Sequence, residues 1–204
     1  MKRFQLWCAA ALLPFLAACS FSLFPKTDFT ETRIFDLASP EPLSSLPFLV
    51  DVESFSTECS GRYKMVFRED TTRISVDEYN RWAMPPGAML TRYLAVRFAA
   101  QADKQEHVEK PAFVLDGSVL NWELDKSKKQ VDMVVRFVIF DPNNDLFRIT
   151  GSEDYSIPIK DTTAEAFADG MNKAASKFAD HVTALLNGEL KNRTARAKDA
   201  ATGK

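Results

Sequence analysis

Few residues of this chain have the types and spacing that catalysis requires. His107 and His181 are the only histidines, so a metal site would have to rely on carboxylates. Asp103, Glu106 and Glu109 surround His107 in a polar connector, but their spacing fixes no tetrahedral or octahedral geometry, and solvated turn residues are the better interpretation. His181 lies beside the apolar stripe of a predicted helix. We therefore predict no metal site and no bound cofactor.

Nucleophile and phosphate-binding motifs give the same result. The chain has no Gly-x-Ser-x-Gly pattern, and its seven glycines form no phosphate-cradling loop. Cys59 stands in the sequence Glu58-Cys59-Ser60-Gly61 without a histidine or asparagine arranged nearby to activate it. We interpret it as an idle or buried thiol, with an intersubunit disulfide or a reactive thiol as the alternatives. No enzymatic activity is predicted.

The N-terminus carries an export signal. Lys2 and Arg3 supply positive charge, and the apolar stretch Phe4–Ala17 follows with Gln5 as its polar exception. Fourteen residues are too few to cross about 30 Å of hydrocarbon, so the stretch is not a transmembrane helix. It ends in Leu16-Ala17-Ala18-Cys19.

These last four residues resemble the lipobox of bacterial lipoproteins. The resemblance implies that residues 1–18 are a signal peptide and that Cys19 becomes the first mature residue, acylated and serving as the membrane anchor. Ser20 follows, where lipoproteins retained in the inner membrane often carry aspartate. The same resemblance therefore favours the periplasmic face of the outer membrane. An ordinary secretory signal is the alternative.

The length and net charge of the mature chain predict a single acidic domain. Removing 18 of the 204 residues leaves 186, which suits one domain with one core. Without Lys2 and Arg3, 24 basic residues stand against 28 acidic ones, so the mature net charge is −4. Residues 191–204 hold five basic residues and one acid, which leaves an acidic body. An exported, acidic body excludes nucleic acid as a partner.

Four segments are predicted along the chain. The signal peptide at 1–18 is followed by Cys19, a tether and an irregular lead-in at 19–47, where Pro40, Pro42 and Pro47 prevent a helix. Residues 48–188 form the folded domain. Residues 189–204 are predicted to be a basic, disordered tail.

Hydrophobic periodicity predicts the elements of the domain. Strands are expected at 48–53, 63–68, 73–76, 113–124, 131–140 and 147–159, and helices from Pro85-Pro86 to about 100 and from Thr162 to Asn187-Gly188. Gly117 suggests a bulge in its strand, and Thr162 with Glu165 has capping-box spacing. The predicted fold is α+β, an antiparallel sheet of about four to six strands with two helices packed on one face.

The segment between the hairpin and the first helix is the most distinctive part of the domain. Arg68 is followed by Tyr79, Trp82, Ala83 and Pro85, and then by a leucine-containing helix. This order and spacing resemble the PqiC-type family of ABC-transport auxiliary lipoproteins, and the wider match spans most of residues 33–188. The lead-in and the basic tail depart from the family pattern.

The resemblance implies a function without catalysis. A member of this family would be a lipoprotein that docks an MCE-type intermembrane lipid transport assembly at the outer membrane, with an MCE-domain protein as partner and homo-oligomerisation as an added expectation. Tyr79, Arg81 and Trp82 are the candidate partner surface, unless they merely fix the joint between hairpin and helix. The alternatives are an assembly lipoprotein resembling that of lipopolysaccharide export, which supports an outer-membrane barrel, and a lipid-binding carrier with an internal cavity.

Overall fold

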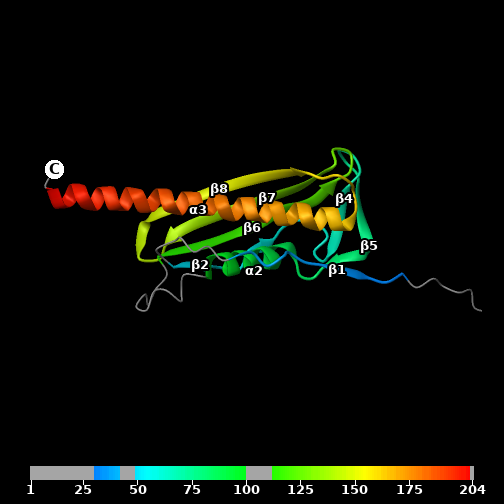
Figure 1. The fold of residues 1–204 in the computed structure, drawn as a ribbon, viewed down its shortest axis with the longest axis horizontal. Helices are drawn as coiled ribbons and strands as arrows, with labels where there is room; N and C mark the ends of the chain where they lie inside the picture. Colours follow the sequence, from blue (N-terminus) through cyan, green and yellow to red (C-terminus); the bar gives the residue numbers. More distant parts are fainter. Residues whose placement is uncertain (1–29, 42–48, 100–111, 203–204) are drawn as a thin grey trace, which may run out of the picture. The chain divides into compact units, whose positions relative to one another are not determined.

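The computed structural model describes residues 30–41, 49–99 and 112–202 (Figure 1). The predicted signal peptide, Cys19 and the polar connector around His107 lie outside these residues. Residues 32–204 form one unit. Its elements are β1 (Arg33–Phe35), β2 (Val50–Val52), β3 (Ser56–Thr57), β4 (Lys64–Arg68), β5 (Ile74–Trp82), α2 (Pro86–Ala99), β6 (Phe113–Asp125), β7 (Gln130–Asp141), β8 (Asn144–Pro158) and α3 (Ala164–Thr202).

All eight strands belong to one mixed sheet, so the predicted α+β class is confirmed. The main path across the sheet is β1-β5-β4-β6-β7-β8, and β2 and β3 also pair with β6. The long strands β6, β7 and β8 form the predicted antiparallel meander, and β4 and β5 form the predicted hairpin.

The strand number and the purely antiparallel pairing were predicted wrongly. β1 pairs in parallel with β5, and β2, β3 and β4 pair in parallel with β6. β2 lies within the strand predicted at 48–53, whereas β1 and β3 were missed, because three and two residues are too few for a period-two pattern to identify. β1 also lies inside the segment predicted to be an irregular lead-in.

The middle strand of the meander, β7, has one fully buried face. Its buried residues alternate along the strand with less buried ones, and they are Val131, Met133, Val135, Phe137 and Ile139. The predicted bulge in β6 exists, but the register shifts between Val119 and Asn121, at Leu120 instead of Gly117. Because of this shift, Val119 and Trp122 both point into the core.

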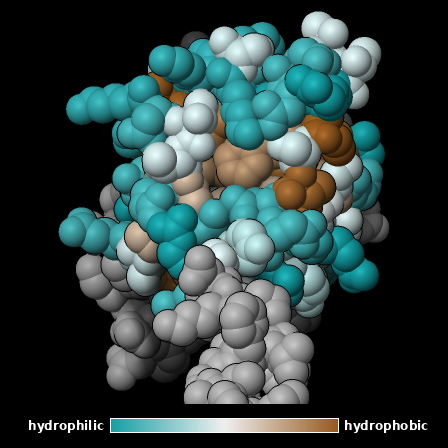
Figure 2. All heavy atoms as spheres, turned by 90° about the vertical axis from the view of Figure 1, so that its right-hand side faces the viewer, coloured by the Kyte–Doolittle hydropathy of each residue, from teal (hydrophilic) through white to brown (hydrophobic). Residues whose placement is uncertain are grey.

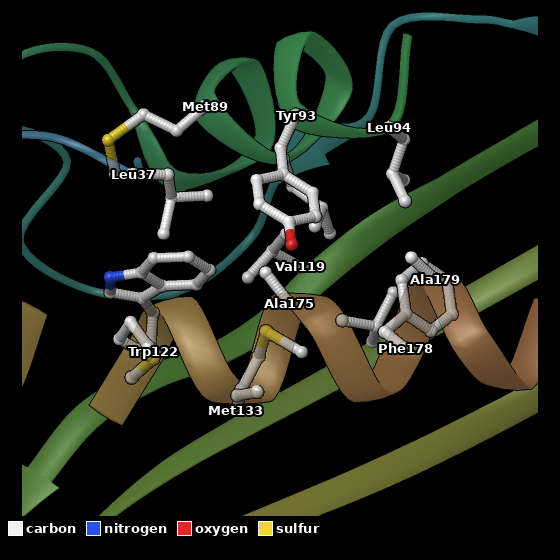
Figure 3. Packing of buried hydrophobic residues seen from close by; sticks show 14 of the residues in the cluster. Leu37, Met89, Tyr93, Leu94, Val119, Trp122, Met133, Ala175, Phe178 and Ala179 are labelled. Carbon is white, nitrogen blue, oxygen red and sulfur yellow. The ribbon is translucent and has the colours of Figure 1, made fainter. Parts of the chain in front are cut away.

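Both helices cover this buried face, as predicted. α2 begins at Pro86, a position where the missing N–H costs nothing. Its buried side chains join those of α3 and the sheet in one core cluster. Figure 3 shows part of this cluster: Tyr93 and Leu94 of α2 lie on one side, Ala175 and Phe178 of α3 lie on the other, and Val119 of the sheet lies among them. Phe178 packs edge-on against Phe137, with ring centroids 5.5 Å apart.

The start of α3 differs from the prediction by one residue. The hydroxyl of Thr163, not of Thr162, caps the helix by accepting a hydrogen bond from the backbone N–H of Ala166 at 3.2 Å. Glu165 therefore has no capping-box role. Its carboxylate instead pairs with the guanidinium of Arg33 in β1 at 2.5 Å, which ties the first strand to the last helix.

The predicted end of α3 near Asn187-Gly188 is wrong, and so is the prediction that the residues after it are disordered. The helix continues to Thr202 and extends past the sheet (Figure 1). Arg193, more than one turn beyond Gly188, accounts for this: its guanidinium pairs with Asp141 at 2.9 Å and lies over the rings of Phe113 and Phe147. These contacts offset the cost of a glycine inside a helix, about 1 kcal/mol.

Candidate functional site

Trp82, one of the three residues predicted to form a partner surface, lies in the core. It is 2% exposed, and its ring packs edge-on against Trp122 and Phe167 at centroid distances of 5.7 and 5.1 Å. Its backbone N–H donates to the carbonyl of Tyr63. Trp82 thus anchors the joint between β5 and α2 by packing, and the prediction that it faces a partner is wrong.

Tyr79 and Arg81 lie on the same strand but are exposed. A side-chain turn fixes their backbone: the carboxylate of Asp77 accepts hydrogen bonds from the backbone N–H groups of Tyr79 and Asn80 at 2.8 and 2.9 Å, and from the Asn80 amide at 2.6 Å. Partial burial alone would raise the pKa of Asp77, but these hydrogen bonds outweigh it and hold the pKa below the usual value. Tyr79 is therefore presented on a rigid support.

Tyr79 belongs to a larger apolar area. Within the part of the chain that the structure describes, the large hydrophobic side chains that remain exposed, between 39% and 70%, all come from β1, β5 and the residue before β4, and they are Ile34, Tyr63, Ile74, Val76 and Tyr79. Ile34 pairs with Arg81 in the β1–β5 register. We call these five residues with Arg81 the β5 surface. Exposed apolar side chains concentrated in one place mark an interaction surface.

The edge of β5 is also open along much of its length. In the described ranges β1 pairs with Asn80–Trp82 of this strand and with no residue before Asn80. Among the described residues, Ile74–Val76 therefore pair with β4 on one side and with no strand on the other, and the pairing with β4 is interrupted between Val76 and Arg81. An open strand edge offers backbone hydrogen-bonding groups to another chain.

A hollow of about 540 Å³ adjoins this edge, between β5 and the start of α3. Phe67 and Val76 contribute apolar surface, and Arg33, Lys126 and Glu165 contribute charges to the lining. Figure 2, which looks onto this end, shows hydrophobic side chains in and beside a hollow rimmed by hydrophilic ones. Lys126 is held over the Phe67 ring at 4.8 Å and pairs with Glu69 at 2.7 Å, so its charge is already compensated.

The other residues considered from the sequence do not assemble a catalytic centre in the described ranges. Burial, with a smaller contribution from the nearby Glu123 carboxylate, raises the pKa of the Cys59 thiol to about 11. The nucleophilic thiolate is therefore disfavoured at neutral pH. His181 lies with its Nε2 3.4 Å from a Glu153 oxygen and its ring against Phe137. No cluster of three metal-ligating side chains occurs among the described residues.

Of the helices within the described ranges, none is both long enough and apolar enough to cross a bilayer.

Of the β5 surface, Tyr79 and Arg81 were predicted as site residues, and Ile34, Tyr63, Ile74 and Val76 were not. The alternation of Ile74 and Val76 with Ser75 and Asp77 is typical of a strand with one apolar face. Periodicity cannot say whether that face meets the core or solvent. The structure answers this. Val76 pairs with Val66, and the neighbours of Val66 along β4, Met65 and Phe67, belong to the core cluster under the helices, so Val66 and Val76 lie on the opposite face.

The fold and the β5 surface together define an α+β domain with an exposed apolar surface beside one strand. The model of the family described as "ABC-type transport auxiliary lipoprotein component" matches residues 60–183, more than half of the chain. The chain belongs to this family, and the resemblance predicted from the sequence is confirmed.

Solved structures of other proteins share this fold. A Xanthomonas campestris protein of the DUF330 family is 16% identical with a TM-score of 0.62, and the match covers 79% of this chain and 99% of that one. An uncharacterized protein is 13% identical with a TM-score of 0.55, over 74% of this chain and 99% of its own. No curated protein matches the chain.

Proposed function

We propose that the protein is a non-catalytic lipoprotein of an MCE-type intermembrane lipid transport system. Family membership supports an accessory part in transport. In the proposal, Cys19 is acylated and anchors the protein at the periplasmic face of the outer membrane, where it docks the periplasmic MCE assembly. In this proposal the protein needs no cofactor, and the lipid on Cys19 serves as an anchor alone.

The β5 surface is the observation that carries the docking proposal. Its apolar side chains lie beside the open edge of β5, and Tyr79 stands out from a backbone that Asp77 fixes. A partner would gain both apolar burial and strand-edge hydrogen bonds there. Arg81, which has no ion-pair partner among the described residues, would meet a polar or acidic group at the rim.

In-cell crosslinking tests this function. A photo-crosslinking amino acid replaces Tyr79 in the full-length, lipidated protein, and the same amino acid at Lys173, an exposed position of α3, serves as the matched control. An MCE-domain protein captured from position 79 and not from position 173 is the expected result. Capture of a second copy from position 79 would instead assign the β5 surface to homo-oligomerisation.

The two rival functions predict other results. An assembly lipoprotein of the lipopolysaccharide-export kind would be captured with an outer-membrane barrel and no MCE protein, which would refute the proposal. A lipid carrier would need an enclosed cavity between sheet and helices. In the described part of the molecule, apolar side chains of both layers occupy that space (Figure 3), which favours docking over carriage.

A further inference from the structure

The sheet face turned away from the helices carries a trough that is separate from the β5 surface. Strand register places side chains of neighbouring strands in rungs across this face. One rung contains Arg136 of β7 beside Ser118 of β6. Two residues further along β7, Val138 lies between Asp116 of β6 and Thr150 of β8.

A third rung closes the other side of the trough. It contains Phe140 of β7 and Arg148 of β8, whose guanidinium lies 5.9 Å from the centre of the Phe140 ring. Long side chains thus form both walls, and the shorter side chains of the Val138 rung form the floor. The resulting groove has a volume of about 460 Å³, and both arginines line it.

Both arginines carry uncompensated charge. Among the described residues, neither Arg136 nor Arg148 has an ion pair, whereas Arg33, Arg68, Arg92, Arg97 and Arg193 all do. The acid in the groove is Asp116, and one of its carboxylate oxygens accepts a hydrogen bond from the backbone N–H of Gly117 at 2.6 Å. Two guanidiniums and one carboxylate leave the trough with a net positive charge.

We propose that this trough binds a phosphate ester, with the phosphate between the guanidiniums of Arg136 and Arg148. Guanidinium groups match phosphate oxygens with paired, charge-assisted hydrogen bonds. The hydroxyls of Ser118 and Thr150 supply further donors, and Val138 supplies apolar surface for the carbon chain next to the phosphate. The site goes beyond the proposed docking function, because it needs neither an MCE partner nor the β5 surface.

Binding to the purified, full-length mature protein in neutral detergent tests the site. Two probes are titrated by calorimetry: phosphatidylglycerol in mixed micelles, and soluble glycerol 3-phosphate. The double variant R136Q/R148Q is compared with K173Q/K177Q, which removes the same charge from exposed positions of α3. We expect the trough variant to bind at least about tenfold more weakly, which corresponds to the loss of one or two charge-assisted hydrogen bonds, and the control to change less than about twofold.

A third variant is expected to bind the phosphate probes more tightly, a result that unfolding of the protein cannot produce. D116N removes the negative charge from the floor, while its amide oxygen can still accept from the N–H of Gly117, so affinity should rise by about threefold. Binding of phosphatidylglycerol alone assigns a lipid headgroup with its chains, and binding of both probes assigns the phosphate group itself. No binding of either probe, an equal loss in both double variants, or no gain in D116N would overturn the proposal.

Discussion

Gly188 lies inside α3 and offers a direct test of the continuous helix. An alanine side chain at this position would meet no atom within 4 Å, so the change is free of steric cost. Alanine is better than glycine by about 1 kcal/mol in a helix interior, through lower backbone entropy in the unfolded chain. Gly188→Ala should therefore raise the free energy of unfolding by about 1 kcal/mol and the melting temperature by about 2–4 °C.

Gly170 supplies a matched control in the same helix. A Cβ atom there would lie 2.6 Å from Cγ2 of Val131 and 3.2 Å from Cγ2 of Ile159, both in packed surroundings. Overpacking of this kind costs about 1–3 kcal/mol, which exceeds the helix-propensity gain. Gly170→Ala should lower the free energy of unfolding, opposite in sign to Gly188→Ala.

Urea unfolding of both variants, followed by circular dichroism, measures the two changes. The reasoning is refuted if Gly170→Ala destabilises as expected while Gly188→Ala is neutral or destabilising. That result would mean that the backbone at 188 is not helical and that the contacts of Arg193 do not continue the helix past the glycine.

Three further changes probe the joint around β5 and its neighbours. Trp82→Phe should cost only about 1 kcal/mol against about 3–5 for Trp82→Ala in urea unfolding, because the buried indole N–H has no hydrogen-bond partner among the described residues. Arg68→Ala should cost about 2–3 kcal/mol at neutral pH by stranding the buried Glu123 carboxylate, and adding Glu123→Gln should recover at least half of the loss. Because the pKa of Asp77 is lowered in the folded protein, its carboxylate contributes its full stabilisation above the usual pKa of 3.8, and this stabilisation is lost as the pH falls through the lower folded pKa. The difference in unfolding free energy between wild type and Asp77→Ala should therefore shrink between pH 7 and pH 3.

Long, strongly patterned segments were predictable from the sequence. β7 has alternating apolar residues along its twelve positions, and β6 and β8 have apolar residues on both sides of an interruption. The proline pair at 85–86 marks the start of α2 within a residue. Local composition determines these elements, which is why the fold class was predicted correctly.

The errors occurred where distant contacts decide the local structure. Ile34 and Phe35 form a strand only because the end of β5 is available for parallel pairing. Gly188 has the composition of a helix end, but the helix continues because Arg193 finds Asp141 and two aromatic rings on other strands. Tyr79 and Trp82 looked alike as candidate site residues, and only the sheet register separates the exposed tyrosine from the buried tryptophan.

Contacts hold residues 33–38 against the rest of the domain, and in the proposed anchoring they limit the distance between the domain and the membrane. Arg33 pairs with Glu165, and Asp36 pairs with Arg92. The backbone N–H of Ala38 donates a hydrogen bond to the side-chain oxygen of Asn172. This segment therefore moves with the sheet and the helices. If Cys19 is the membrane anchor, as proposed above, residues 20–32 are the chain that connects it to β1. Thirteen residues reach at most about 45 Å when fully extended. A transport assembly can use this domain only if its end comes within that radius of the bilayer.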